Sequence, residues 1–289
     1  MRRPARILAA SVLLALIGVF ALPTAATAAP SVTLVAGSPE GAFDSVEYNG
    51  LTYVFANDQG TGDDHIWAFD GTTFVDAVPG QTFLNADSPV VYNGEIFFAG
   101  YDGTDWMLWH FDGTTAEAVT GVGPQPTDID ELVVYDGLLY FTADDGGGDI
   151  VLWVYDGTES VIVPGGPTSV SSLAVFGSDL VFVADNGSDF VLFVFTGSAF
   201  AEATGSGPVP LNPSGLIVAG GLVVLDGDVG LDHPLITWDG SAFVVRDTGT
   251  PPDAAIVGFG AGVLGSSVLF SGILGPEIVA FVFDGTTVA

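Results

Sequence analysis

The sequence predicts an all-β protein, a six-bladed β-propeller of four-stranded antiparallel blades. Short apolar runs alternate with Gly, Pro, Asn and Asp, and no segment has the 3.6-residue periodicity of a helix. A glycine that follows an aromatic strand recurs every 40 to 45 residues, a period typical of propeller blades. These turn glycines are Gly71, Gly113, Gly157, Gly197, Gly240 and Gly285.

The first 28 residues are predicted to be a signal peptide. Arg2, Arg3 and Arg6 precede an apolar run from Ile7 to Leu22, and the small residues that follow fit a cleavage site before Ala29. The apolar run is shorter than the roughly 20 residues that a membrane span needs. We therefore expect one exported domain, residues 29–289, that is secreted or associated with the cell surface and not inserted in a membrane.

The charge of the chain limits its partners. The sequence has 4 basic and 35 acidic residues, and removal of the leader leaves Arg246 as the only basic one. Such a surface repels nucleic acid and anionic membranes. The absence of cysteine excludes disulfides and a thiol nucleophile. We expect a monomer whose partners are an extracellular glycan or protein.

Each repeat unit reads as four strands. Strand one ends at Asn-Gly or Asp-Gly, for example Asn49-Gly50, which favours a type I′ hairpin turn into strand two. Strand three carries large aromatic side chains two residues apart, such as Trp153 and Tyr155, and these lie on one face. We interpret them as the filling between neighbouring blades, with a ligand-stacking platform as the alternative. The predicted blades span residues 44–80, 87–120, 130–164, 171–205, 214–247 and 257–289.

Strand three then turns at Asp-Gly-Thr or a close variant into strand four. In this turn Asp bonds its own backbone and Gly supplies the geometry, so these aspartates are interpreted as structural. The sixth unit has too few residues after Thr286 for an outer strand. An orphan strand at Ser31–Val35 is predicted to pair onto blade six and close the ring, because closure leaves no edge unpaired.

The repeat resembles that of the ELWxxDGT-repeat proteins, which are secreted and surface-associated bacterial proteins. The matching residues are Leu108-Trp109 with Asp112-Gly113-Thr114, and Leu152-Trp153 with Asp156-Gly157-Thr158. The Glu that usually precedes Leu-Trp is replaced here by Met107 and Val151. The resemblance implies a propeller outside the cell and no defined reaction.

Acidic residues recur where strand two ends, at Asp58, Asp102, Asp144, Asp185 and Asp226. An Asx turn explains them, and a calcium loop is the alternative. Asp226, Asp228 and Asp232 are spaced so that a hard cation with six to eight oxygen ligands would suit them. Calcium is therefore the candidate cofactor. The acidic loops share one end of the blades, and loops on a rigid scaffold commonly carry binding sites.

A second acidic set, Asp44, Asp87 and Asp130, lies 43 residues apart at the start of strand one, which is nearest the central channel. These residues form either an acidic arc for a cation or sugar, or solvated strand caps. His65, His110 and His233 are expected on the surface. His65 and His233 each follow an acidic residue, but they fall in blades one and five, which are too far apart for a shared zinc site.

No nucleophile motif or phosphate loop is present. We predict a non-enzymatic, acidic binding or structural propeller. The alternative is a glycosidase or lyase with two catalytic carboxylates, although the sequence shows no pair set apart by an apolar neighbourhood.

Overall fold

The computed structural model describes Val35 and residues 38–57, 64–81, 85–120, 125–213, 215–230, 234–246, 255–264, 267–274 and 277–286. All regular structure in these residues is β-strand, so the prediction of an all-β chain is confirmed. Because the described part has no helix, it offers no apolar helix that would cross a bilayer.

The strands form separate antiparallel sheets, which we number 1 to 6 in chain order. Each of the first five has four strands in sequential order, as the repeat predicts, and the described strands of sheet 6 number three. Sheets 1 to 3 contain β1 (Glu40–Tyr48), β2 (Leu51–Asn57), β3 (Asp64–Phe69) and β4 (Phe74–Asp76); β5 (Asn85–Tyr92), β6 (Glu95–Tyr101), β7 (Trp106–Phe111) and β8 (Ala116–Ala118); β9 (Thr127–Tyr135), β10 (Leu138–Asp144), β11 (Ile150–Tyr155) and β12 (Ser160–Ile162). Sheets 4 to 6 contain β13 (Thr168–Phe176), β14 (Asp179–Asp185), β15 (Phe190–Phe195) and β16 (Phe200–Glu202); β17 (Leu216–Ala219), β18 (Leu222–Asp226), β19 (Leu235–Trp238) and β20 (Phe243–Arg246); β21 (Ala255–Leu264), β22 (Ser267–Leu274) and β23 (Glu277–Phe283).

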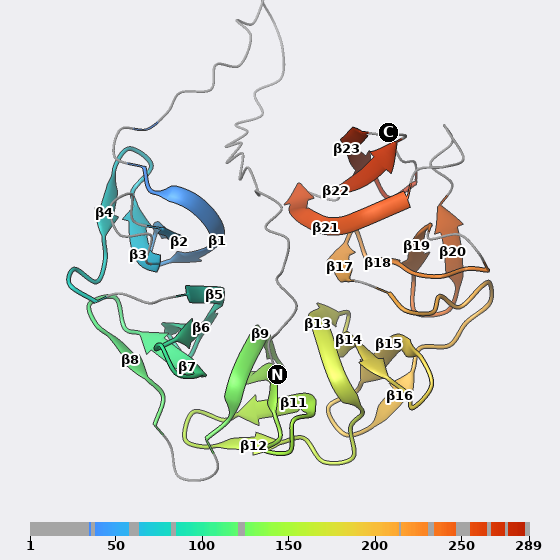
Figure 1. Ribbon diagram of the computed structural model, residues 1–289, viewed down its shortest axis with the longest axis horizontal. Coiled ribbons are helices and arrows are strands. Elements are labelled where there is room, and N and C mark those ends of the chain that lie inside the picture. Colours follow the sequence, from blue (N-terminus) through green and yellow to red (C-terminus); the bar gives the residue numbers. More distant parts are fainter. Residues whose placement is uncertain are drawn as a thin grey trace, which may run out of the picture.

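The sheets stand side by side around a central axis (Figure 1). The first strand of each sheet faces the centre, and first strands of consecutive sheets contact one another from β1 to β21. The fourth strands lie on the outside. Because every sheet has the same strand order, the two hairpins of each sheet lie at one end, the turn end, and the loops between second and third strands lie at the other, the loop end.

The core consists of wedges of apolar side chains between consecutive sheets. Phe55 of sheet 1 packs against Phe98 of sheet 2, with ring centroids 5.2 Å apart. Trp153 and Tyr155 fill the wedge between sheets 2 and 3, and Phe193 fills the one between sheets 3 and 4. Similar clusters join sheet 4 to 5 and sheet 5 to 6. The aromatic residues of strand three therefore pack in the core, as predicted.

Tyrosines at the end of strand one link sheet 1 to sheet 2 and sheet 3 to sheet 4. The hydroxyl of Tyr48 donates to the carbonyl of Gly94 at 2.7 Å, and that of Tyr135 donates to the carbonyl of Ser178 at 3.0 Å. Both acceptors lie in hairpin turns of the following sheet. The predicted hairpins are also confirmed, because Asn49 and Gly50 have the positive φ angles, 50° and 80°, that a type I′ turn requires.

Closure of the ring is not resolved by these strands. No described strand pairs with the outer edge of β23. The orphan strand predicted at Ser31–Val35 lies outside the described residues except for Val35, which is not in a strand. The signal peptide, residues 1–28, also lies outside them.

Candidate functional site

The three aspartates predicted near the central channel occupy one register position on neighbouring first strands. Asp44 on β1, Asp87 on β5 and Asp130 on β9 each pair with the fifth residue of their own second strand. Ser171 takes the same position in sheet 4. The fold thus places these carboxylates in an arc on the inner strands of sheets 1 to 3.

A β-bulge follows this position in sheets 2, 3 and 4. Ser88, Glu131 and Ser172 have φ angles of 55°, 52° and 60°, which non-glycine residues rarely adopt. A bulge leaves backbone groups unpaired. Carboxylates of the preceding sheet accept these N–H groups: Asp44 Oδ2 from Ser88 at 3.1 Å, and Glu131 Oε2 from Leu173 at 3.0 Å. Asp44 therefore ties sheet 1 to sheet 2, and Glu131, beside Asp130, ties sheet 3 to sheet 4.

Asp44 has an altered acidity. Burial raises the pKa of this carboxyl above its ordinary value of 3.8, and the negative charge of Asp130 raises it further. The hydrogen bond from the Ser88 N–H acts in the opposite direction and is the weaker effect. The structure therefore provides a carboxyl in a desolvated environment, which the sequence did not reveal.

We expect Asp44→Asn to stabilise the protein at neutral pH. Since the folded-state pKa lies above the unfolded value of 3.8, the stability contributed by Asp44 is complete below pH 3.8 and is lost as the pH rises through the folded-state pKa. Asparagine does not ionise and still accepts from Ser88. Urea unfolding at pH 3 and pH 7 should show a gain for the variant only at pH 7, whereas an equal effect at both pH values would contradict this assignment.

The aspartates of the Asp-Gly-Thr turns are structural, as predicted. Asp70 Oδ1 accepts hydrogen bonds from the backbone N–H groups of Thr72 and Thr73, both at 2.8 Å, and from the Thr72 hydroxyl. Hydrogen bonds from Thr72 and Thr73 lower the pKa of Asp70 to about 2, and those from Thr115 and Thr114 do the same for Asp112. These carboxylates are fully used in closing their turns.

The loop end carries Asx turns at most of the predicted positions. Asp102 Oδ1 accepts from the N–H groups of Thr104 and Asp105, and Asp144 Oδ1 accepts from Gly146 and Gly148. Asp185 accepts from Gly187. Asp58 lies outside the described residues. The Asx-turn interpretation is therefore confirmed in sheets 2 to 4.

The last acid of each of these loops is used differently. In each loop the backbone N–H of this last acid donates to a side chain earlier in the loop. Asp105 donates to the carboxylate of Asp102, and Asp149 donates to that of Asp145. Asp189 donates to the side-chain oxygen of Asn186. Their own carboxylates accept no hydrogen bond from the described residues. Asp105 and Asp149 are exposed and Asp189 is half-buried. The loop end of sheets 2 to 4 thus presents three carboxylates on ordered backbone.

Asp64 and His65 are both buried, so the prediction that His65 lies on the surface is wrong. Asp64 is 3% exposed and His65 is 8% exposed. Asp64 Oδ1 accepts from the side-chain amide of Asn57 at 2.5 Å, and Asp64 Oδ2 accepts from the N–H of Ala86 in sheet 2 at 2.9 Å. Sheet 2 therefore covers Asp64, whereas His65, the next residue of β3, points to the opposite face and lies 3.3 Å from Asp76.

Asp64→Ala is expected to lower the free energy of unfolding by about 1–3 kcal/mol, because the N–H of Ala86 would stay buried without an acceptor. Asp64→Asn keeps an acceptor oxygen and should cost less. Urea denaturation of both variants measures the difference. A loss for Asp64→Ala no larger than that of an exposed substitution such as Glu159→Ala would contradict the role of Asp64.

The predicted calcium residues are only partly described. Asp226 ends β18 and is 1% exposed. Asp228 Oδ2 accepts from the side-chain amide of Asn212 at 3.0 Å, and Asp232 lies outside the described residues. No group of three or more His, Asp and Glu side chains suited to a metal occurs within the part of the chain that the structure describes.

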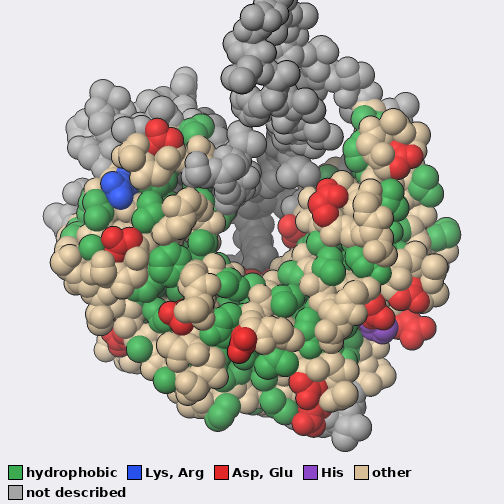
Figure 2. Space-filling model, turned by 180° about the vertical axis from the view of Figure 1, so that it is seen from behind, with side chains coloured by type: hydrophobic (Ala, Val, Ile, Leu, Met, Phe, Trp, Pro, Cys, Tyr) green, Lys and Arg blue, Asp and Glu red, His purple; other side chains and the backbone are tan. Residues whose placement is uncertain are grey.

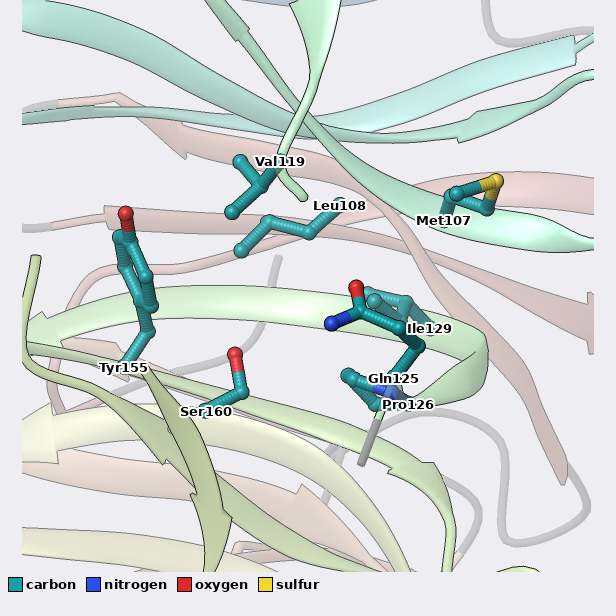
Figure 3. Close-up of a pocket in the computed structure, with 8 residues that line it drawn as sticks. All are labelled: Met107, Leu108, Val119, Gln125, Pro126, Ile129, Tyr155 and Ser160. Carbon is teal, nitrogen blue, oxygen red and sulfur yellow. The ribbon is translucent and has the colours of Figure 1, made fainter. Parts of the chain in front are cut away.

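Sheets 2 and 3 enclose two hollows that the sequence did not predict. A cavity of about 10 Å³, room for about one water, is lined by Leu108, Val119 and Ile129 with Gln125, Tyr155 and Ser160 (Figure 3). A groove of about 380 Å³ lies beside it, at the turn end. Tyr155 and Val119 line both. The groove includes His110, which forms an ion pair with Glu95 at 2.6 Å.

No protein-family model matches the chain, and no curated protein matches it in sequence. Solved structures match the chain in fold. The β-propeller domain of the Trilobed protease from Pyrococcus furiosus, described as having an open velcro topology, has a TM-score of 0.54 and 12% identity over 86% of this chain and 84% of that one. A puromycin-hydrolysing peptidase of Mycobacterium tuberculosis has a TM-score of 0.63 and 13% identity over 86% and 43% of the two chains. An acylaminoacyl peptidase of Pyrococcus horikoshii has a TM-score of 0.54 and 12% identity over 86% and 45%.

The chain thus spans most of the protease's propeller domain and less than half of each of the two peptidases. At such identities the likeness concerns the fold alone. The chain has a β-propeller fold.

Proposed function

We propose that the protein is an exported, non-enzymatic β-propeller whose loop end binds an extracellular glycan or protein, with calcium as a stabiliser. The observation that carries the proposal is the ordered row of Asp105, Asp149 and Asp189, whose carboxylates the described residues leave without hydrogen bonds. Fixed charges on a rigid scaffold bind a partner with little loss of conformational entropy. Acidic side chains also spread around the ring on the face shown in Figure 2.

Export follows from the residues before Ala29, and the repeat's resemblance to secreted ELWxxDGT proteins agrees with it. The complete fold we propose is a monomeric ring of six blades, closed when Ser31–Val35 pairs with the free edge of β23. Such pairing supplies the fourth strand that sheet 6 lacks among the described residues. Deletion of residues 29–35 should then speed amide exchange in β23, and unchanged exchange would contradict closure.

The binding proposal is tested with the mature chain on arrays of extracellular glycans and proteins. The triple variant Asp105→Asn, Asp149→Asn, Asp189→Asn retains the Asx turns and should abolish the binding that wild type shows. The control is Glu47→Gln, Asp136→Asn, Asp179→Asn, which removes as many charges from the turn end. Binding that survives in the triple variant, or is lost equally in the control, would overturn the assignment to the loop end.

Calcium is tested by thermal unfolding with millimolar calcium and with chelator. An ion that binds the folded chain and not the unfolded one raises the melting temperature, and the rise grows with the logarithm of the ion concentration above its Kd. We expect a rise that Asp226→Asn and Asp228→Asn diminish. If calcium raises the melting temperature no more than sodium chloride of equal ionic strength does, calcium is removed from the proposal.

A second function, a glycosidase or lyase with two carboxylates, is favoured by one observation. Burial and the charge of Asp130 raise the pKa of Asp44, and a raised pKa is what the general acid of such an enzyme requires. Release of reducing ends from a polysaccharide, abolished by Asp44→Asn and by Asp130→Asn, would support this function. Glycan binding without such release would support the first one.

A further inference from the structure

The groove between sheets 2 and 3 arises where one sheet departs from the repeat. A cross-strand row in sheet 2 joins Phe97, His110 and Glu117. The matching rows in sheets 1, 3 and 4 are Tyr53, Ala68 and Val75; Tyr140, Val154 and Val161; and Val181, Val194 and Ala201. The second and third members of those rows are apolar, so only sheet 2 of these four places ionisable groups there.

The side chains of this row form one wall of the groove. His110 Nδ1 lies 2.6 Å from Glu95 Oε2, and the two side chains are 30% and 37% exposed. The His110 ring stacks on Phe97 at a centroid distance of 5.7 Å. Glu117 is exposed on β8, opposite His110. The hydrogen bond with Glu95 and the stacking on Phe97 therefore hold the imidazole in place, and Glu117 lies across from it on β8.

The opposite wall belongs to sheet 3. Tyr155 is 9% exposed, lines the groove, and its ring lies 5.8 Å from that of Phe97. Its hydroxyl makes no hydrogen bond with the described residues. Burial raises the pKa of Tyr155, and the neighbouring Tyr92, Asp156 and Glu95 act in the same direction, so the phenol stays neutral. A neutral phenol on the wall of a groove of about 380 Å³ leaves its hydroxyl available to a ligand.

The side chains that line the groove indicate the charge of its ligand. Glu95 and Glu117 are acceptors only, and the sole basic residue outside the predicted leader, Arg246, lies in sheet 5. We propose that this groove binds a guanidinium or ammonium group, between the Glu95 and Glu117 carboxylates and against the aromatic ring of Tyr155. Charge-assisted hydrogen bonds and a cation–π contact supply the affinity. The inference does not depend on what the loop end binds.

Isothermal titration of the mature protein with arginine amide, lysine amide and citrulline amide, each acetylated on its α-amino group, tests the proposal. Acetylation removes the α-ammonium charge, so citrulline amide then has the shape of arginine amide without any charge. We expect saturable binding of arginine amide with one site, weakened about tenfold or more by Glu95→Gln and by Glu117→Gln. The matched control is Asp179→Asn, which removes a carboxylate at the position of sheet 4 that Glu95 occupies in sheet 2.

Equal weakening by Asp179→Asn would show general electrostatic attraction and overturn the site. Equal binding of citrulline amide would overturn the requirement for a cation. If the amides bind, an arginine-containing peptide compared with free arginine amide distinguishes a protein partner from a small metabolite, since only the peptide should gain affinity from neighbouring residues.

Discussion

Replacing Trp153 with alanine is expected to lower the free energy of unfolding by about 3–5 kcal/mol. Trp153 is 2% exposed and fills the wedge between sheets 2 and 3. Its ring stacks on Phe141 with an interplanar angle of 11°. Removing the indole leaves a cavity that two rigid sheets cannot close by moving together, because each also packs against another neighbour. Urea unfolding followed by circular dichroism measures the loss.

Trp153→Phe is the informative control. The buried indole N–H of Trp153 has no hydrogen-bond partner in the described residues, so its removal costs no bond. Phe193 holds the equivalent position in sheet 4 and stacks on Phe182 in the same manner. We therefore expect a cost below about 1.5 kcal/mol. If Trp153→Phe were as damaging as Trp153→Ala, the indole would have a role other than filling the wedge.

The repeat explains how much of this fold can be predicted from the sequence. Each Asp-Gly-Thr turn and each Asn-Gly hairpin is a local structure, set by backbone angles and by hydrogen bonds within a few residues. The aromatic residues of strand three lie on one face of the sheet and need a surface to pack against. The neighbouring sheet, which has a similar sequence, provides that surface. Strand order and the wedge cores follow from these local rules.

Features that depend on a neighbouring sheet could not be predicted. Asp64 resembles an exposed loop acid in the sequence, yet the N–H of Ala86, 22 residues away, makes it an interior acceptor. The bulges at Ser88 and Glu131 have no glycine to mark them, and the N–H of Ser88 donates to Asp44 in another sheet. The raised pKa of Asp44 likewise depends on burial and on the charge of Asp130, which lies in sheet 3.

The groove was missed for a different reason. The sequence analysis assigned binding to the long acidic loops, since tight turns rarely carry sites. At the turn end, however, the substitution of His110 and Glu117 into an otherwise apolar row changes the chemistry without changing the fold. A comparison of the repeats position by position along the paired strands, rather than by motif, identifies such departures.

Gly207→Ala is expected to destabilise the protein by about 3–5 kcal/mol, the sum of backbone strain and a steric clash. Gly207 has a φ of 94°, and the segment that contains it crosses from sheet 4 beside sheet 5. There the N–H of Phe243 donates to the carbonyl of Ser206 at 2.8 Å. An added Cβ would overlap the backbone carbonyl oxygen of Phe243, which cannot rotate away without breaking β20 from β19.

Gly71→Ala separates the two contributions. Gly71 also has a φ of 94°, but no atom lies within 4 Å of an added Cβ, so only strain of about 1–2 kcal/mol is expected. Urea unfolding measures the loss of stability in both variants. The Nε1 of Trp238 donates to the carbonyl of Thr204 at 3.3 Å, so the fluorescence of Trp238 reports displacement of the crossing segment. Equal losses in the two variants, with unchanged Trp238 emission, would mean that the crossing moves freely on sheet 5. A greater loss for Gly207→Ala would instead show that this connection is part of the packed scaffold that holds sheets 4 and 5 together.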